Sequence, residues 1–250
     1  MERYGLLGFP LSHSFSKGFF SDKFDTLGIN ANYQNIEIAP QNLSSIRDYI
    51  AEQPDLCGLN VTIPYKQSIV PFLDELDETA KAVGAVNVIK IERRPEGLHL
   101  TGYNTDCIAF EKSLCPLLHS SHRSAYVLGT GGASKAVCYV LQKLGIKFTP
   151  VSRQDAPGLL TYSEITPDLL SRTSLVINTT PLGMYPNVNE QPSLPYQAVT
   201  AAHLFYDLVY NPEMTRFLFH AHRHGAETKN GLEMLNLQAE ASWDIWQAND

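Results

Sequence analysis

A glycine turn between an apolar run and a helical pattern constrains the fold of this chain most strongly. The run 125–128 predicts a buried strand, the turn reads Gly129-Thr-Gly-Gly-Ala-Ser134, and the segment 135–144 has apolar residues at helical spacing. Strand, glycine turn and helix in this order typically bind the pyrophosphate of a dinucleotide, because glycines allow close backbone approach and the helix N-terminus offers free N–H groups. Candidate cofactor contacts are therefore Gly129, Gly131, Gly132 and Ala133.

The position of the turn along the chain predicts a second module. A dinucleotide-binding turn normally lies near the start of its domain, whereas more than 120 residues precede Gly129 here. A chain of 250 residues has room for two domains of ordinary size. A nucleotide-binding module with a separate module before it indicates a dehydrogenase that carries its own substrate domain.

Apolar runs alternate with helical patterns along both modules. In the first module we expect strands over 4–8, 33–38 and 56–63, helices over 16–27 and 43–52, and a hairpin of 86–92 with 98–102. In the second we expect a linking helix over 106–114, strands over 146–151, 175–179 and 204–209, and a final helix over 232–246. We therefore predict an α/β fold of two domains, with a mixed sheet in the first and a doubly wound parallel sheet in the second.

Composition excludes several function classes. The net charge is −7 and no basic block occurs, which argues against a nucleic-acid partner. The chain has no apolar run of about 18 residues and no leader pattern, so we expect a cytoplasmic protein without a membrane partner. Its four cysteines form no C-x-x-C pair, which favours reduced thiols. His220 and His224 lack further residues at metal-ligand spacing, so we expect a solvated helix end and no metal site.

The segment after the second strand of the cofactor module indicates which nicotinamide cofactor is used. An acidic residue about 20 positions past the glycines binds the ribose 2′-hydroxyl of NAD, whereas an arginine there accommodates the 2′-phosphate of NADP. This chain reads Val151-Ser-Arg-Gln154, with Ser152 and Arg153 at the end of the strand. Arg153 either makes bidentate contact with that phosphate, which suits an arginine, or is an ordinary surface residue, and the glycine turn upstream favours the phosphate contact. We therefore predict NADP(H) as the cofactor.

Three polar clusters in the first module stand where strands end. Ser14 and Ser16 lie one residue apart near a helix start, where they either bind a carboxylate or cap the helix. Lys66 follows Asn60-Val-Thr-Ile-Pro-Tyr and either relays a proton during carbonyl reduction or lies on the exposed start of a helix. Asp106 ends Gly102-Tyr-Asn-Thr-Asp106 and either supports that lysine or caps a helix.

These segments together resemble the shikimate dehydrogenase family, and the match runs nearly from end to end. Eight motifs follow the order of that family: Gly8-Phe-Pro-Leu-Ser-His-Ser-Phe-Ser16, Asn60-Val-Thr-Ile-Pro-Tyr-Lys66, Gly84-Ala-Val-Asn87, Asn104-Thr-Asp106, Gly129-Thr-Gly-Gly-Ala133, Asn178-Thr-Thr-Pro-Leu-Gly-Met184, Tyr206-Asp-Leu-Val-Tyr-Asn-Pro212, and Asn230-Gly-Leu-Glu-Met-Leu235 with Gln238. Each motif is a modest signal, and eight in one order leave little room for chance.

The resemblance implies reversible, NADPH-dependent reduction of 3-dehydroshikimate to shikimate, a step toward chorismate and the aromatic amino acids. It implies a discontinuous substrate domain (1–104 with 232–250), a Rossmann-like NADP domain (105–231), and an active site in the cleft between them. Lys66 and Asp106 would form the catalytic pair. The implied substrate contacts are Ser14, Ser16, Thr62, Asn87, Tyr210 and Gln238. The implied cofactor contacts add Thr179, Met184 and Gly231 to the glycine turn, Ser152 and Arg153.

This chain departs from the family pattern at a few positions. Lys17 stands where the family usually has proline, and Cys107 where it has glycine. The cofactor loop lacks the family's second basic residue after Arg153, since Pro157 stands there. Each lost phosphate contact weakens the preference for NADP by about tenfold if it contributes ~1.4 kcal/mol, so we expect partial discrimination against NAD.

Two other functions stay open at this point. The first is a dehydrogenase that also oxidises quinate and uses NAD as well as NADP, which would differ around Ser14, Ser16 and Tyr210. The second is a catalytically idle relative that binds the ligand as a regulator. The sequence retains Lys66 and Asp106, which argues against the idle relative. We expect a small-molecule substrate and either a monomer or a homodimer.

Overall fold

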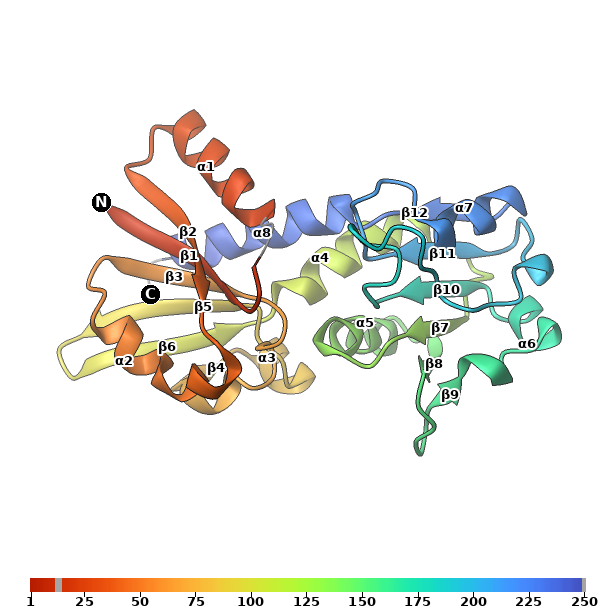
Figure 1. Cartoon of the computed structure of the whole chain (residues 1–250), viewed down its shortest axis with the longest axis horizontal. Helices are drawn as coiled ribbons and strands as arrows, with labels where there is room; N and C mark the ends of the chain where they lie inside the picture. The colour runs from red at the N-terminus through yellow and green to blue at the C-terminus, as the bar shows by residue number, and fades with distance from the viewer. Residues whose placement is uncertain (12–14, 249–250) are drawn as a thin grey trace. The chain divides into compact units, whose positions relative to one another are not determined.

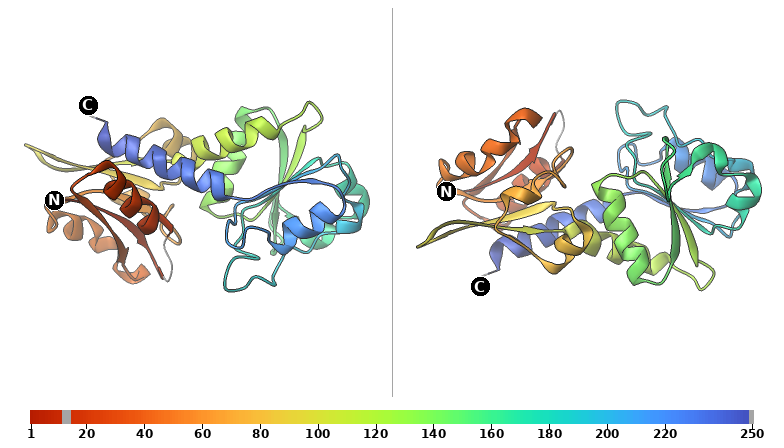
Figure 2. Two further views of the ribbon diagram at one scale, coloured as in Figure 1. Left: turned by 90° about the horizontal axis from the view of Figure 1, so that it is seen from above. Right: turned by 90° about the horizontal axis from the view of Figure 1, so that it is seen from below.

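The computed structural model describes residues 1–11 and 15–248. The chain forms two compact units, unit 1 from Met1–Thr105 with Gln238–Asp250 and unit 2 from Asp106–Leu237. The described residues of each unit build a six-stranded sheet of their own (Figure 1). Helix α4 (Thr105–Leu114) and helix α8 (Leu232–Gln247) each contain one boundary between the units. Figure 2 shows α8 as one unbroken ribbon. The two-domain α/β fold is thereby confirmed, whereas the predicted boundaries and the roles of the units stay predictions.

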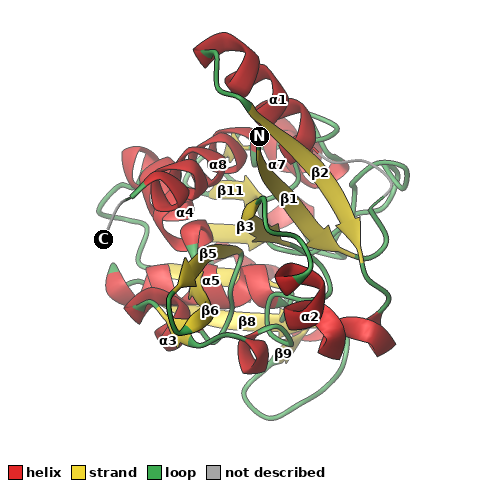
Figure 3. Cartoon of the chain, turned by 90° about the vertical axis from the view of Figure 1, so that its left-hand side faces the viewer, coloured by secondary structure: helices red, strands yellow, loops and turns green. Residues whose placement is uncertain are grey.

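Unit 1 contains a mixed sheet with the strand order β2-β1-β3-β5-β6-β4. Strand β1 pairs in parallel with β2 and β3, whereas β5 runs antiparallel to β3 and β6. Figure 3 shows β1 and β2 side by side. The strands are β1 (Glu2–Gly8), β2 (Ala31–Glu37), β3 (Leu56–Val61), β4 (Glu75–Leu76), β5 (Val88–Arg94) and β6 (Gly97–Tyr103). The predicted mixture of directions is confirmed.

The helices of unit 1 are α1 (Phe15–Leu27), α2 (Ile46–Ala51) and α3 (Glu78–Val83). The helix expected over 43–52 splits into a 3-10 turn (Pro40–Ser45) followed by α2. The Ser45 hydroxyl donates to the Asn42 carbonyl at 2.8 Å, a local bond that competes with helical pairing. Helix α3 was not expected, although Asp77 caps it and Gly84 ends it in a left-handed conformation, as helix signals do.

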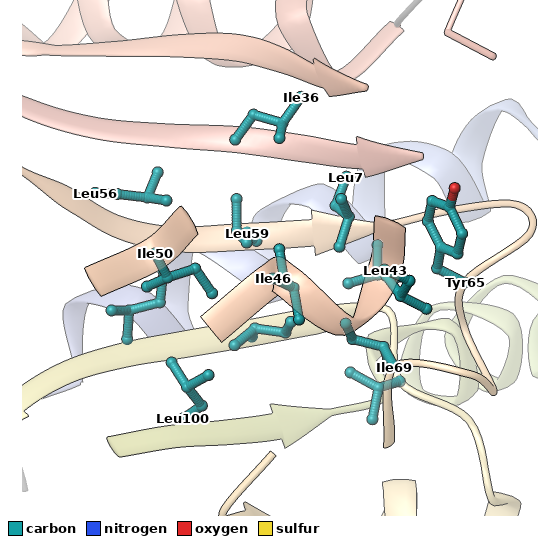
Figure 4. Close-up of a cluster of buried hydrophobic side chains, with 14 of the residues drawn as sticks. Leu7, Ile36, Leu43, Ile46, Ile50, Leu56, Leu59, Tyr65, Ile69 and Leu100 are labelled. Carbon is teal, nitrogen blue, oxygen red and sulfur yellow. The ribbon is translucent and has the colours of Figure 1, made fainter. Parts of the chain in front are cut away.

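Side chains on both faces of the unit 1 sheet are buried. Neighbouring residues on a strand point to opposite faces. Thus Leu7 packs with Leu59, Ile46 and Ile50 on the α2 side (Figure 4), whereas Leu6 packs on the other side. That second core contains Tyr4, Phe20, Tyr33 and Trp246. Because Trp246 lies near the end of α8, the last helix of the chain completes the core of unit 1.

Unit 2 contains a parallel sheet with the strand order β12-β11-β10-β7-β8-β9. Its strands are β7 (Ser124–Leu128), β8 (Lys147–Ser152), β9 (Leu160–Thr161), β10 (Leu175–Asn178), β11 (Leu204–Asp207) and β12 (Glu227–Lys229). From β7 the chain adds β8 and β9 on one side of β7, and then crosses over to add β10, β11 and β12 on the other side. This reversal makes a topological switch point between β7 and β10, where doubly wound folds bind ligands at the carboxyl edge.

The remaining helices of unit 2 are α5 (Gly132–Lys143), α6 (Pro167–Ser171) and α7 (Arg216–Arg223). Helix α7 ends at Arg223 and His224 is its C-cap, so the histidine run does lie at a helix end. The His220 ring lies 5.1 Å from the Tyr196 ring, centroid to centroid. In the part of the chain that the structure describes, no group of three His, Cys, Asp or Glu side chains is placed to hold a metal ion.

Asp207, at the end of β11, is a fully buried carboxyl group that ties three segments of unit 2 together. Its oxygens accept hydrogen bonds from Asn178 Nδ2 at 2.9 Å, from the Val209 N–H at 3.0 Å and from the Thr215 hydroxyl at 2.6 Å. Burial raises the pKa of Asp207 to about 7, although these three donors oppose the rise. Between about pH 4 and pH 7 the folded protein therefore holds a proton on this group that the unfolded chain has already released.

The raised pKa of Asp207 predicts a pH-dependent stability. Between the unfolded pKa of about 4 and the folded pKa of about 7, the folded state binds more protons, so the free energy of unfolding falls as the pH rises. Urea titrations of the wild type and of Asp207→Asn from pH 4 to pH 8 measure this contribution. We expect the difference in stability between wild type and variant to fall by a few kcal/mol, of order 1.4 kcal/mol per pKa unit, across that window and to level off above it.

The isosteric asparagine keeps one oxygen for Asn178 and Val209, and the exposed Asp25→Asn serves as the matched control. A pH-independent difference for Asp207→Asn would show that this carboxyl group is ionised throughout.

Candidate active site

The glycine turn of unit 2 has the geometry of a phosphate-binding turn. Gly129 has a φ of +112°, and a Cβ atom there would lie 2.7 Å from Thr179 Oγ1, so this position requires glycine. The Ser134 hydroxyl donates to the Gly129 carbonyl at 2.7 Å and closes the turn. Helix α5 begins at Gly132 with Gly131 as its N-cap and with no side-chain cap. Its first N–H groups are therefore available to an anion at the positive end of the helix dipole.

The ends of the neighbouring strands meet at this turn. Both the N–H and the hydroxyl of Thr179 donate to the Leu128 carbonyl, at 2.9 and 2.7 Å, which places Thr179 directly at the switch point after β10. On the other side the Gly129 N–H donates to the Val151 carbonyl at 2.9 Å. The turn, Thr179 and the end of β8 thus form one continuous edge. Of the predicted cofactor contacts, the structure brings together Gly129 and Thr179, next to the end of the strand that carries Ser152.

Ser152 and Arg153 follow β8 at the same edge. Ser152 Oγ accepts a hydrogen bond from the Gln154 N–H at 3.1 Å, which shapes a tight turn around an exposed Arg153. Burial raises the pKa of Tyr162, and the positive charge of Arg153 opposes that rise, so the electrostatic field of this arginine reaches the phenol. No local pattern indicates that Tyr162 neighbours Arg153, because the two lie on separate segments.

Two predicted cofactor residues and one predicted substrate residue lie in the loops beyond the switch point. Met184 is exposed in the loop after β10. Gly231 immediately precedes α8, and a Cβ atom there would lie 2.1 Å from the Leu208 carbonyl oxygen, so no side chain fits. Its N–H donates to the Val209 carbonyl at 3.1 Å, next to the half-buried Tyr210. Tyr210 thus belongs to unit 2, whereas the other predicted substrate residues belong to unit 1.

In unit 1 the parallel strands β1 and β3 end beside each other. The Thr62 N–H donates to the Leu7 carbonyl at 2.9 Å, and the Phe9 N–H donates to the Ile63 carbonyl at 3.1 Å. A Cβ atom on Gly8 would lie 2.6 Å from the Thr62 methyl group, so the two strand ends are in close contact. Strand β1, which precedes Ser16 in the chain, therefore ends at the same edge of the sheet as Thr62. Ser14 lies outside the described residues, whereas Ser16 lies in the first turn of α1.

The turn that carries Lys66 is fixed on both sides. The Lys66 carbonyl accepts a hydrogen bond from the Val86 N–H at 2.7 Å. The preceding residue, Tyr65, is almost fully buried in the core shown in Figure 4, and its hydroxyl donates to the Ile38 carbonyl. The backbone at Lys66 is therefore held firmly, which suits a residue that must present its ammonium group at a defined place.

Asn87 immediately precedes β5 and is almost fully buried. Its Nδ2 donates to Thr105 Oγ1 at 2.9 Å, and its Oδ1 accepts from the Thr105 N–H at 2.8 Å. This pair fixes the first residue of α4, and Asp106 follows in the first helical turn with 5% of its surface exposed. Lys66 belongs to unit 1 and Asp106 to unit 2, so their predicted pairing stays a prediction.

Gln238 is the first residue of α8 assigned to unit 1, and it is half-buried. From this point α8 packs into unit 1, since Ser242 accepts a hydrogen bond from Asn60 Nδ2 at 2.9 Å and the Trp246 indole donates to the Ile89 carbonyl at 3.1 Å. Sequence reasoning named neither Ser242 nor Tyr33 as part of the site. Both residues hydrogen-bond to Asn60, Ser242 across 182 positions of the sequence and Tyr33 across 27, and only these bonds in the folded chain reveal them.

Comparison with known proteins places these features in a family. Residues 6–89 match the family model described as the shikimate dehydrogenase substrate binding domain. The chain is 36% identical to a shikimate dehydrogenase (NADP(+)) of Methanococcus maripaludis, over 97% of this chain and 90% of that protein. None of the helices in the described residues is long and apolar enough to cross a membrane.

Solved structures of shikimate dehydrogenases are also similar to this chain. Shikimate dehydrogenase 1 from Peptoclostridium difficile is 35% identical with a TM-score of 0.85, covering 100% of this chain and 94% of that one. A quinate dehydrogenase from Corynebacterium glutamicum, solved in complex with NAD, is 26% identical with a TM-score of 0.85, covering 98% and 93%. The identity along nearly the whole chain and the shared two-unit fold establish that this chain belongs to the shikimate dehydrogenase family of oxidoreductases.

Proposed function

We propose that this chain catalyses the reversible, NADP-dependent interconversion of 3-dehydroshikimate and shikimate. The observation that carries the proposal is the glycine-requiring turn at the switch point of unit 2, with Arg153 at the end of the adjacent strand. A Cβ atom at Gly129 would fill the turn, which is the signature of a backbone that a phosphate approaches closely. The substrate follows from membership of the family, whose relative in Methanococcus maripaludis is named for shikimate and NADP(+).

The proposed substrate residues match the functional groups of the substrate. Shikimate carries one carboxylate and several ring hydroxyls. The hydroxyls of Ser14 and Ser16 bind the carboxylate through hydrogen bonds, with Tyr210 beside them. Thr62, Asn87 and Gln238 bind the ring hydroxyls, because their hydroxyl and amide groups both donate and accept.

The proton on the reacting oxygen is handled by Lys66 and Asp106. When bound, the nicotinamide cofactor supplies hydride to the carbonyl carbon or accepts it in the reverse direction. In the reduction Lys66 donates a proton to the carbonyl oxygen as it becomes a hydroxyl, and in the oxidation it takes that proton back. Asp106 stabilises the ammonium form of Lys66 and orients it.

Arg153 selects the cofactor. Its exposed guanidinium binds the 2′-phosphate of NADP, while Ser152 shapes the turn beneath it. The N–H groups at Gly132 and Ala133 bind the pyrophosphate, and Thr179, Met184 and Gly231 line the remainder of the cofactor site. We further infer that the enzyme is cytoplasmic and acts as a monomer or a homodimer.

The second candidate function is a dehydrogenase that accepts quinate and NAD as well. The structural likeness to the quinate dehydrogenase and the absence of a second basic residue after Arg153 both favour it. Quinate bears a tertiary hydroxyl beside its carboxylate, so the choice depends on the space around Ser14, Ser16 and Tyr210.

Steady-state oxidation of shikimate and of quinate, each with NADP and with NAD, tests the function directly. We expect shikimate with NADP to give the highest kcat/KM, with NAD weaker by about tenfold because one cation, Arg153, remains to bind the 2′-phosphate that NAD lacks. A comparable kcat/KM for quinate, or an equal kcat/KM with NAD, would favour the second candidate function. An absence of any shikimate-dependent rate would overturn both.

Replacing Lys66 tests the proton transfer. Lys66→Met keeps the length of the side chain and removes the ionisable group, so we expect kcat to fall by about 10²-fold or more with little change in the KM for shikimate. Stopped-flow and steady-state assays separate the two constants. Lys81→Met, at an exposed position of α3 in the same unit, is the control. An unchanged kcat in Lys66→Met would remove this lysine from the mechanism.

Replacing Arg153 tests the recognition of the 2′-phosphate. We expect Arg153→Ala to raise the KM for NADPH by about tenfold and to change the KM for NADH less than about twofold, because NADH lacks that phosphate. Arg172→Ala, an exposed arginine after α6 in the same unit, should leave both constants unchanged. Equal increases for both cofactors in Arg153→Ala would mean that this arginine supports the loop and does not bind the phosphate.

A further inference from the structure

A continuous series of buried and partly buried hydrogen bonds links three of the proposed substrate residues of unit 1. One end is at Tyr33, whose ring stacks on Phe20 with centroids 4.7 Å apart and planes 12° from parallel. The buried Tyr33 hydroxyl donates to Asn60 Oδ1 at 2.8 Å. Burial raises the pKa of Tyr33 and a hydrogen bond from the Ser16 side chain opposes the rise, so Ser16 lies beside this hydroxyl. Because the stacked ring cannot move freely, Tyr33 fixes Ser16 relative to the end of β3.

The series continues from Asn60 onto α8. Asn60 Nδ2 donates to Ser242 Oγ at 2.9 Å, and the Ser242 hydroxyl donates to the Gln238 backbone carbonyl at 2.7 Å. A serine hydroxyl has a single proton to donate, so these two bonds fix its rotation completely. Ser242 has no exposed surface, which excludes direct contact between its side chain and solvent. Its hydroxyl therefore acts as a link between Asn60 and the helix that carries Gln238.

The other end of the series is Asn87. The Gln238 carbonyl accepts a second hydrogen bond, from Thr105 Oγ1 at 3.1 Å. The same Thr105 oxygen accepts from Asn87 Nδ2 at 2.9 Å. Ser16, Gln238 and Asn87, which are far apart in the sequence, are thus connected within unit 1 by side chains outside the proposed catalytic and binding set.

We propose that Ser242 is a positioning residue for the substrate, acting with Tyr33 through Asn60. It sets the separation between Ser16, which holds the carboxylate, and Gln238, which holds ring hydroxyls. This inference rests on the proposed function, which supplies the substrate. The cyclohexene ring of shikimate is stiff and keeps its carboxylate and hydroxyls at fixed separations. The groups that bind them must match these separations, since hydrogen bonds weaken steeply when distance or angle departs from the optimum.

The test compares Ser242→Ala with a matched buried serine in unit 2. Ser242→Ala removes the link, so we expect the KM for shikimate to rise by about tenfold, kcat to change less than about threefold, and the KM for NADP to stay constant. Ser113 is equally buried, and its Oγ bonds the Phe110 carbonyl at 3.1 Å and the Tyr206 hydroxyl at 2.7 Å. Ser113→Ala loses bonds of the same kind and should leave the KM for shikimate unchanged.

Tyr33→Phe provides a second variant that keeps the stacked ring and removes the bond to Asn60. We expect it to raise the KM for shikimate in the same way, and the double variant Tyr33→Phe/Ser242→Ala to show less than the product of the two effects, because both break one network. Ser242→Thr retains a hydroxyl and should restore the KM. If Ser242→Ala does not fold, Tyr33→Phe and Ser242→Thr still decide the question.

The outcomes separate this inference from the proposed function. An active wild type whose KM for shikimate is unchanged in Ser242→Ala and Tyr33→Phe overturns the positioning role and leaves the function intact. The positioning role is likewise overturned if Ser113→Ala raises that KM equally, or if the effects of the two substitutions multiply. An inactive wild type overturns the proposed function and this inference together.

Discussion

The contact between Trp246 and Gly58 is the constraint on which the rest of unit 1 depends. A Cβ atom on Gly58 would lie 2.3 Å from the indole nitrogen, so β3 presents bare backbone to the ring. The indole also stacks on Tyr4 at 4.8 Å between centroids and donates to the Ile89 carbonyl. Residues four apart lie on one face of a helix, so Gln238, Ser242 and Trp246 share a face of α8. The depth at which Trp246 packs therefore sets the position of Ser242 and Gln238.

In unit 2 the candidate cofactor residues are positioned mainly by backbone geometry. All its strands are parallel, so their carboxyl ends lie at one edge, and the reversal of order between β7 and β10 leaves that edge open at one point. Gly129 lies at this point, where its lack of a side chain leaves room for the backbone of the turn. The Thr179 hydroxyl donates to the Leu128 carbonyl at the end of β7, and the Ser134 hydroxyl donates to the Gly129 carbonyl in the turn. The same edge holds Asp207, whose bond to Thr215 fixes the N-cap of α7.

Sequence reasoning succeeded where a local signal exists. The apolar runs predicted β1, β3, β7, β10 and β11 to within a few residues, and the glycine turn predicted the start of α5. It missed β4, β9 and β12, which have two or three residues each, too few for a period to be visible. It also gave no sign of the proposed roles of Tyr33 and Ser242. A tyrosine that stacks on Phe20 and a serine in a helix read as ordinary core and surface residues, and their bonds depend on how distant segments pack.

The buried hydrogen bonds of unit 1 are explained better by the geometry that they impose on neighbouring side chains than by a gain in stability. An apolar replacement that removes both partners of a buried hydrogen bond is often nearly neutral for stability, and the apolar cluster around Leu59 and Ile46 shows that this sheet packs well without polar groups. Apolar contacts tolerate small shifts, whereas the Tyr33–Asn60–Ser242 series fixes each atom in angle as well as distance. It lies between the strand end at Thr62 and the helix position of Gln238. In unit 1 this series of polar groups therefore lies where, under the proposed function, a small displacement would misplace a binding group.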